Sequence, residues 1–179
     1  MTEDNKFKII KHDSLDSTSA KAKEMAAAGA EPWTVVLAQK QEGGYGRKGN
    51  AWYSPEGGLY FSVILPKSNI DDLQTMTILA AFSVAKTIKE QFGAEPFVKL
   101  PNDVYLNGKK ICGILTENVI AGDIKSSVIG IGINTNIGYF PVDLAGATSL
   151  KIELGKTIDN NDILEQSISQ LQLIFKSIS

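Results

Sequence analysis

The residues best suited to bind an anion lie in one loop, which runs from Gln41 to Pro55 and reads QEGGYGRKGNAWYSP. Four glycines in this loop surround Arg47 and Lys48. Glycine has no Cβ, so its backbone N–H can approach an anion closely, and a row of such groups forms an anion-binding nest. An arginine adds a planar fork of charged donors. The loop therefore favours phosphate binding, and a long hairpin loop with solvated charges is the alternative.

Hydroxyl side chains form a second candidate site, at the start of a predicted helix. Asp16, Ser17 or Thr18 can cap this helix, because a side-chain oxygen accepts the free N–H groups of the first turn. Helix propensity is high over Ala20 to Ala28, and Gly29 supplies a left-handed stop. Polar or anionic ligand groups bind well at a helix N-terminus. The two hydroxyls are thus candidate ligand contacts, and the alternative is that they only cap the helix.

A third group of candidate residues lies on a predicted antiparallel meander. Two short strands are predicted over Phe97 to Leu100 and Val104 to Leu106. The pair Asn107-Gly108 is typical of a type I′ hairpin turn. We expect the chain to return as a strand from Lys110 to Ile120.

The last strand of this meander is predicted over Ile124 to Asn134, after a tight turn at Gly122-Asp123. Its apolar core carries glycines at positions 130 and 132, which fall on one face. Glycine weakens a strand and often marks a place where a ligand lies against the sheet, although tight packing explains it too. The meander is expected to place five candidates on neighbouring strands: Asp103, Lys110, Gly113, Gly130 and Gly132.

The remaining elements are predicted from apolar periodicity and turn residues. Strands are expected over Phe7 to Lys11, Trp33 to Ala38 and Leu59 to Leu65, a turn over Pro66 to Asp72 and a long core helix over Leu73 to Phe92. Beyond Asn136 we expect a loop from Tyr139 to Thr148, a short extended segment from Thr148 to Glu153, and a final helix capped by Asp159 to Asn161.

Composition limits the class of protein. The 179 residues suit one domain, with 43% hydrophobic and 21% charged residues, as in ordinary soluble proteins. A net charge of −2 gives no bulk attraction to nucleic acid. The acidic start lacks the apolar core of a signal peptide, and no apolar stretch reaches membrane-spanning length. We therefore expect a cytoplasmic protein with neither a membrane nor a DNA partner.

Cysteine and histidine offer little chemistry. The single cysteine, Cys112, excludes an internal disulfide and is expected to be a small core side chain. His12 is the only histidine, and no HxxxH or CxxC spacing exists. A transition-metal site is therefore not expected.

Four motifs occur in order along the chain: DSTS at 16–19, GGYGRKG followed by WYSP, KLPNDVYLNGKKICGIL at 99–115 and GIGINTN at 130–136. Together they resemble the catalytic domain of biotin protein ligases over roughly residues 8 to 137. The resemblance implies an α+β fold with a mixed, mostly antiparallel sheet and helices mainly on one face, like the class II aminoacyl-tRNA synthetase domain. It also implies ATP and Mg²⁺ as cofactors and biotin as substrate.

The resemblance also implies roles for individual residues. Arg47 and Lys110 would act on the reacting carboxylate and phosphate, and Asp103 would hold Mg²⁺ or orient Lys110. The implied biotin contacts are Ser17, Thr18, Ser19, Gln41, Gly44, Tyr45, Gly46, Arg47, Lys110, Gly113 and Gly130. The implied nucleotide contacts are Arg47, Lys48, Trp52, Asn102, Gly132 and Asn134, with burial of Trp52 as an anchor of the loop as the alternative.

The chain departs from the family pattern at four positions. Tyr45 stands where the family usually has the first arginine of the loop, and Asn50 replaces the last one. Leu100 replaces a tryptophan, and Ser19 stands where asparagine is frequent. We expect residues 1–179 to form a single catalytic domain, without the DNA-binding domain that some members carry or the family's small C-terminal domain.

The resemblance implies a monofunctional ligase that makes biotinyl-5′-AMP and passes biotin to a lysine of a carboxyl carrier domain. Adenylation of a carboxylate needs no general base, but it needs positive charge to bring two anions together. The alternatives are a lipoate or octanoate ligase or transferase of the same superfamily, and a non-catalytic binder of biotin or its adenylate. A homodimer formed through an exposed sheet edge is a further expectation.

Overall fold

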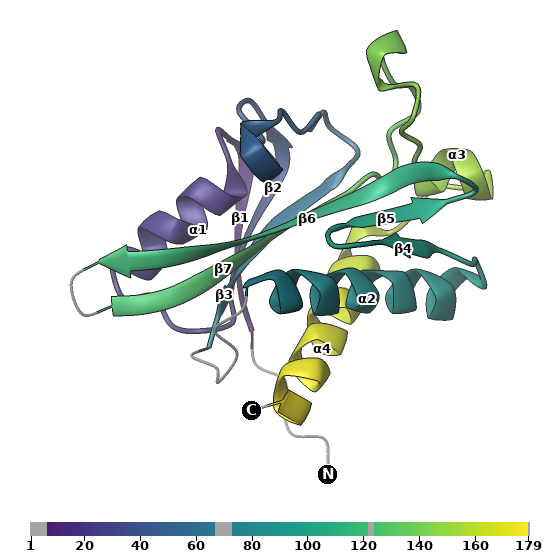
Figure 1. Ribbon diagram of the computed structural model, residues 1–179. Helices are drawn as coiled ribbons and strands as arrows, with labels where there is room; N and C mark the ends of the chain where they lie inside the picture. The colour runs from purple at the N-terminus through teal and green to yellow at the C-terminus, as the bar shows by residue number, and fades with distance from the viewer. Residues whose placement is uncertain (1–6, 67–72, 122–123, 179) are drawn as a thin grey trace.

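Seven strands form a single sheet in the computed structural model, which describes residues 7–66, 73–121 and 124–178 (Figure 1). The spatial order is β1-β2-β3-β7-β6-β5-β4. β1 and β2 run parallel, and every other neighbouring pair is antiparallel. The bounds are β1 Lys8–Leu15, β2 Thr34–Gln41, β3 Leu59–Leu65, β4 Phe97–Lys99, β5 Asp103–Leu106, β6 Lys109–Ala121 and β7 Ile124–Ile133. The predicted mixed, mostly antiparallel sheet is confirmed.

The helices cover the sheet unequally. α2 (Leu73–Phe92) and α4 (Asn160–Ile178) pack against each other and against one face, and α1 (Thr18–Ala27) packs on the opposite face. A short α3 (Leu150–Leu154) and two 3₁₀ turns, η1 (Arg47–Gly49) and η2 (Val142–Leu144), lie in the connections. Most of the helical mass is therefore on one face, as expected, and the face that carries α1 is left partly open.

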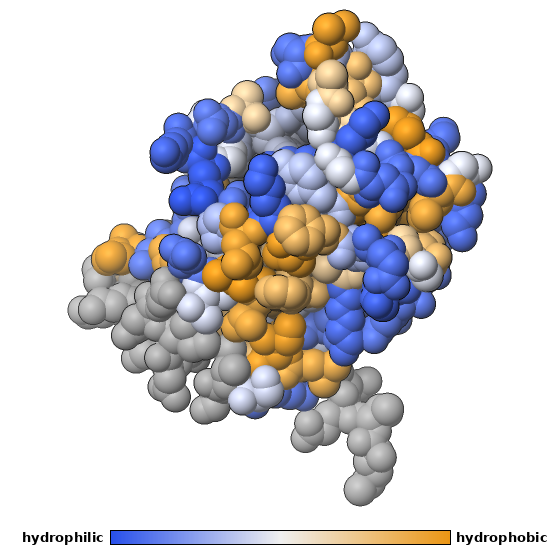
Figure 2. All heavy atoms as spheres, turned by 45° about the vertical axis from the view of Figure 1, so that its right-hand side comes forward, coloured by the Kyte–Doolittle hydropathy of each residue, from blue (hydrophilic) through white to orange (hydrophobic). Residues whose placement is uncertain are grey.

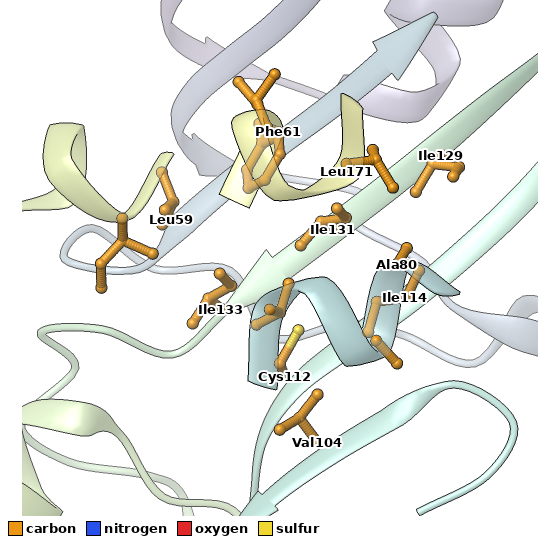
Figure 3. Close-up of a cluster of buried hydrophobic side chains, with 14 of the residues drawn as sticks. Leu59, Phe61, Ala80, Val104, Cys112, Ile114, Ile129, Ile131, Ile133 and Leu171 are labelled. Atoms are coloured by element: carbon orange, nitrogen blue, oxygen red, sulfur yellow. The ribbon is translucent and has the colours of Figure 1, made fainter. Parts of the chain in front are cut away.

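Alternation along the central strands divides the sheet into an apolar face and a small-residue face. The odd-numbered residues Phe61, Ile129 and Ile131 point into the core under α2 and α4, where Ala80 and Leu171 meet them (Figure 3). A fully buried side chain of this size contributes about 1.5–3 kcal/mol. The large side chains on this face therefore hold the sheet and the two helices together.

On the opposite face of the same strands, small residues lie beside the start of α1, and apolar side chains such as Ile64 and Val128 pack against the rest of this helix. Gly113 of β6 pairs with Gly132 of β7, and Gly130 of β7 pairs with Ser62 of β3. Asp103 of β5 pairs with Gly113, so one row across three strands reads Asp103, Gly113, Gly132. The predicted juxtaposition of these residues is confirmed, and they face the side of the sheet that carries α1.

Local signals in the sequence set most element boundaries. β3 and α2 begin and end at the predicted residues. Asn107 and Gly108 both have positive φ, at 50° and 79°, as a type I′ turn requires. The side chain of Ser17, one of the three predicted caps, caps α1. The predicted turns over Pro66 to Asp72 and at Gly122-Asp123 fall largely or wholly outside the described residues.

One predicted element is wrong. Residues 148–153 do not form an extended segment, because α3 occupies most of them. Ser149 caps this helix by accepting a hydrogen bond from the N–H of Ile152, and Gly155 ends it with a φ of +68°. The serine and the glycine were the available signals, but a helix of a little over one turn is too short to show periodicity.

Apolar side chains also reach the surface. Phe82 of α2 and Leu173 of α4 are about half exposed, and Figure 2 shows a band of apolar side chains on one face of the molecule. In the described part of the chain, no helix combines the length and the apolarity needed to cross a bilayer.

The buried thiol gives a test of the core. Cys112 is fully buried, and burial raises the pKa of its thiol far above the ordinary range. Since the thiolate is the reactive form, labelling of the native protein with dithionitrobenzoate at pH 8 should be about a thousandfold or more slower than labelling in guanidinium chloride. Comparable rates in the two conditions would contradict the packing described here.

Candidate active site

A cavity of about 360 Å³ opens on the small-residue face of the sheet. Its walls come from the start of α1, the end of β2, the glycine loop, the β4–β5 turn and strands β5, β6 and β7. Fifteen predicted site residues line it: Ser17, Thr18, Ser19, Gln41, Tyr45, Gly46, Arg47, Lys48, Trp52, Asn102, Asp103, Lys110, Gly113, Gly130 and Gly132. Five lining residues were not predicted: Asn50, Ala51, Ile114, Leu115 and Ile131.

Two predicted site residues lie outside this cavity wall. A Cβ at Gly44 would lie 2.6 Å from Ser54 Oγ and 2.8 Å from Gln41 Nε2, so this glycine allows the loop to pass close behind the cavity. Asn134 lines a second cavity instead.

The glycines of the floor accommodate other side chains of this chain. A Cβ at Gly130 would collide with Ser19 Oγ, and a Cβ at Gly132 would collide with Trp52 Nε1. A Cβ at Gly113 would lie 3.0 Å from the same indole ring. Trp52 therefore lies across part of the floor that the sequence predicted to be bare.

Polar side chains at one end of the cavity form a directional chain of hydrogen bonds. Thr18 donates from both its hydroxyl and its backbone N–H to Gln41 Oε1, at 3.0 and 2.8 Å. Ser62 Oγ donates to Thr18 Oγ1 at 2.9 Å, and Ser19 Oγ lies 3.0 Å from Ser62 Oγ. Because the Ser62 proton is already engaged, Ser19 is the donor to Ser62. Gln41 Nε2 in turn donates to Ser54 Oγ at 2.9 Å.

The hydrogen-bond network gives the residues at the start of α1 different roles. Ser17 acts as the helix cap by accepting from the N–H of Ala20, and it also lines the cavity. Thr18 and Ser19 instead join the buried network, so the two predicted roles are divided among neighbouring residues.

The glycine loop is a small hairpin in this structure. Tyr45 pairs with Ala51, the N–H of Gly46 donates to Asn50 O, and the N–H of Trp52 donates to Gly44 O, both at 2.8 Å. The tip is η1, where Lys48 has a φ of 59°. Several loop amides are thus engaged within the protein in this conformation, and the side chains of Arg47 and Lys48 line the cavity.

All three predicted cations, Arg47, Lys48 and Lys110, border the same cavity. Lys110 Nζ lies 2.6 Å from Asp103 Oδ1 and 5.2 Å from the centre of the Trp52 ring. Arg47 Nη1 donates to Asn102 Oδ1 over a long 3.4 Å. The lysine is therefore held by a carboxylate and an aromatic face, whereas the arginine is only loosely fixed and can turn toward a ligand.

A second cavity of about 320 Å³ adjoins the first and shares Ala51, Trp52 and Lys110 with it. Its other lining residues are Tyr53, Tyr105, Asn134, Phe140, Asp143, Leu144, Gly146 and Ala147. Tyr53 and Phe140 meet edge to face at 6.2 Å. Sequence reasoning treated 139–148 as a loop without chemistry, and only its aromatic residues could have indicated this wall.

Two buried polar atoms near this second cavity have no hydrogen-bond partner among the described residues: Asn134 Oδ1 and Trp52 Nε1. Asn134 is almost fully buried, and its Nδ2 donates to Thr148 O at 3.0 Å, which fixes the amide orientation. An unpaired buried polar atom costs about 1–3 kcal/mol, so these two atoms are sites where a partner from outside the chain, a water or a ligand group, would bind.

The arrangement can hold two ligands whose anionic ends meet. One cavity is lined by hydroxyl and amide groups, the other by aromatic rings and an amide oxygen, and Lys110 lies where they join. A fixed cation at such a junction lets two anions approach and stabilises the charge that develops between them.

The family model for the biotin/lipoate A/B protein ligase family matches residues 12–134. The bifunctional ligase/repressor BirA of Bacillus subtilis is 41% identical over 163 residues, covering 88% of this chain and 50% of that protein. The biotin--[acetyl-CoA-carboxylase] ligase of Paracoccus denitrificans is 30% identical and covers 84% of this chain and 65% of its own length. This chain thus spans about half to two thirds of these relatives.

Among solved structures, the biotin protein ligase of Aquifex aeolicus in complex with biotin and ATP superposes with a TM-score of 0.86 at 32% identity. The superposition covers 95% of this chain and 71% of that chain. The family match spans well over half of the sequence, and the chain belongs to the biotin/lipoate A/B protein ligase family.

Proposed function

We propose that this chain is the catalytic part of an ATP-dependent biotin protein ligase. The observation that carries the proposal is the position of Lys110, at the junction of a polar cavity and an aromatic one. The ligands named for the Aquifex structure, biotin and ATP, have the chemistry that these two cavities suit.

Biotin fits the first cavity. Its ureido ring would lie against the hydrogen-bonded hydroxyls of Thr18 and Ser19 and the side chain of Gln41. Its carboxylate would point toward Lys110 and Arg47. A saturated alkyl chain or a dithiolane would leave this polar end without partners, which disfavours octanoate and lipoate.

ATP fits the second cavity. The unpaired Asn134 Oδ1 would accept from the exocyclic amine of the base, and the indole of Trp52 offers an aromatic face. The α-phosphate would then meet the biotin carboxylate beside Lys110. Base stacking on an aromatic ring contributes about 1–3 kcal/mol.

The first chemical step follows from this placement. A biotin carboxylate oxygen attacks the α-phosphorus, the bond from that phosphorus to the bridging oxygen of pyrophosphate breaks, and biotinyl-5′-AMP forms. Two negatively charged groups must approach, and Lys110 and Arg47 supply the positive charge that allows it. In the second step a lysine amine of a carrier domain attacks the acyl carbon, AMP leaves, and the amine loses a proton.

Mg²⁺ is the remaining element of the proposal. Among the residues that the structure describes, no three His, Cys, Asp or Glu side chains are grouped so that they could hold a metal ion. Mg²⁺ is commonly bound through substrate phosphates and one or two carboxylates. Asp103 is the carboxylate that lines the first cavity. The ion would arrive with ATP and neutralise phosphate charge. The ion pair with Lys110 supports orientation of the lysine as the main role of Asp103.

The wider setting is part of the same proposal. Residues 1–179 would act as a single catalytic domain in the cytoplasm, with a carboxyl carrier domain as protein partner and without a DNA partner. Pairing of two copies through a sheet edge stays a prediction. A non-catalytic binder is the rival, because the structure is compatible with ligand retention without turnover.

The first test removes the junction lysine. Purified protein is incubated with biotin, MgATP and a carrier domain, and the carrier is weighed by mass spectrometry. We expect biotin on one carrier lysine with the wild type, and a rate about a hundredfold lower with Lys110→Ala. Lys109→Ala is the matched control, because Lys109 is the exposed neighbour and should keep the wild-type rate.

The same assay separates the alternatives. A mass gain only with lipoate or octanoate would replace biotin as the substrate. Bound biotin without transfer in the wild type would identify a binding protein. Equal rates for Lys110→Ala and Lys109→Ala would remove Lys110 from the proposed chemistry.

A second prediction concerns Asp103. If its carboxylate accepts the proton of the attacking amine, Asp103→Asn should slow transfer from preformed biotinyl-5′-AMP by about a hundredfold. Unchanged transfer from the preformed adenylate would rule out proton acceptance. Slower adenylation in the same variant would then assign Asp103 to holding Lys110.

A third prediction concerns the floor. Gly132→Ala places a methyl group where Trp52 Nε1 lies, so the indole must move. We expect weaker ATP binding, by about tenfold, in calorimetric titration, because one stacking face shifts. Gly138→Ala, at a position with open space around it, is the control and should bind ATP as the wild type does. Equal affinity for ATP in both variants would show that Trp52 does not contribute to nucleotide binding.

A further inference from the structure

Three side chains from separate elements meet beside the glycine loop. The hydroxyl of Tyr45, in the loop, donates to Glu117 Oε2 of β6 at 2.9 Å. Lys23 Nζ of α1 lies 2.7 Å from Glu117 Oε1 and 5.5 Å from the centre of the Tyr45 ring. One carboxylate thus joins the loop to both the helix and the sheet that flank the cavity.

The contact lies at a position where it can restrain the loop. Tyr45 lines the cavity and forms the base of the small hairpin through its pairing with Ala51. Glu117 lies on the same face of β6 as Gly113, where α1 packs and brings Lys23 into contact with it. At the other end of the hairpin, the described contacts of Arg47 include only a long bond to Asn102. The Tyr45 contact is the shorter of these two side-chain ties.

Burial strengthens the three-residue cluster. About a third of the Lys23 side chain and a quarter of the Glu117 side chain are exposed. Burial alone would lower the pKa of Lys23, but Glu117 and Tyr45 together outweigh it and the pKa lies above its ordinary value. Burial raises the pKa of the Tyr45 phenol. The lysine therefore stays charged and the phenol keeps the proton that it donates.

We propose that Tyr45, Glu117 and Lys23 form a latch that holds the glycine loop over the ligand and sets how long the acyl-adenylate is retained. The retention part rests on the proposed function, whereas the latch itself does not. All three are positioning residues, because they act through the loop and not on the reacting atoms.

The latch explains the tyrosine at a position where the related pattern has arginine. The Tyr45 hydroxyl is committed to Glu117 and so faces a carboxylate, not a phosphate. An arginine at the same position could make the same bond with a charged donor. Loss of the guanidinium therefore changes the strength of a tie on the loop and leaves the anion-binding charges, Arg47 and Lys110, in place.

The first experiment uses the ligand-free protein and hydrogen exchange measured by mass spectrometry. Glu117→Gln, Lys23→Met and Tyr45→Phe should each speed exchange of the hairpin amides 44–52 by about five- to tenfold, because each weakens a bond to a charged group. Glu24→Gln and Lys21→Met are matched controls from an exposed ion pair of α1 and should leave these rates unchanged. Wild-type rates in the three latch variants would overturn the latch.

The second experiment follows loss of preformed, radiolabelled biotinyl-5′-AMP from the protein in gel filtration. Tyr45→Phe should release it about five- to tenfold faster than the wild type, and Tyr45→Arg should restore retention to the wild-type level or beyond. A merely structural role would not be rescued by arginine. Faster loop exchange with unchanged release would refute control of retention while the latch stands.

Failure of the proposed function is recognisable separately. In that case the wild type would not bind biotinyl-5′-AMP at all, which would refute control of adenylate retention, and the exchange rates of the ligand-free hairpin would still decide whether the latch exists.

Discussion

Strand register is the constraint on which the site depends. Gly113 faces Gly132 across β6 and β7, and Gly130 faces Ser62 across β7 and β3. Because side chains alternate along a strand, the same pairing sends large residues such as Ile131 to the opposite face. A slip of one residue would fill the cavity with branched side chains and empty the core. The stability of the fold and the openness of the site are thus set by one register.

The charge that attracts anions is local to the cavity. The chain as a whole is slightly acidic, so a general field does not draw anions to it. Attraction is local and comes from Arg47, Lys48 and Lys110, which border one cavity. Asp103 holds the lysine in place, and Trp52 covers it from one side. The firmly held lysine fixes the position of one charge, whereas the loosely held arginine can adjust to the ligand.

The sequence could predict what alternation and turn chemistry determine. The same-face glycines of β7 and the Asn-Gly turn were readable because strand period and positive φ are local properties. The placement of Trp52 on the glycine floor was not, since a loop residue far along the chain makes that contact. The contact of Tyr45 with Glu117 likewise depends on tertiary packing. The wall built from 139–147 needed the fold before its aromatic residues could be assigned.

The hydrogen bonds among the hydroxyls beside α1 all run in one direction from donor to acceptor, and this direction decides what the hydroxyls can bind. Ser19 gives its proton to Ser62, Ser62 to Thr18, and Thr18 to Gln41, so each proton is committed inward. The lone pairs of these hydroxyl oxygens are what remains available to a ligand. Thr18 and Ser19 are therefore arranged to accept from N–H groups of a ligand, and a ligand with acceptors alone would form no hydrogen bond with these two hydroxyls.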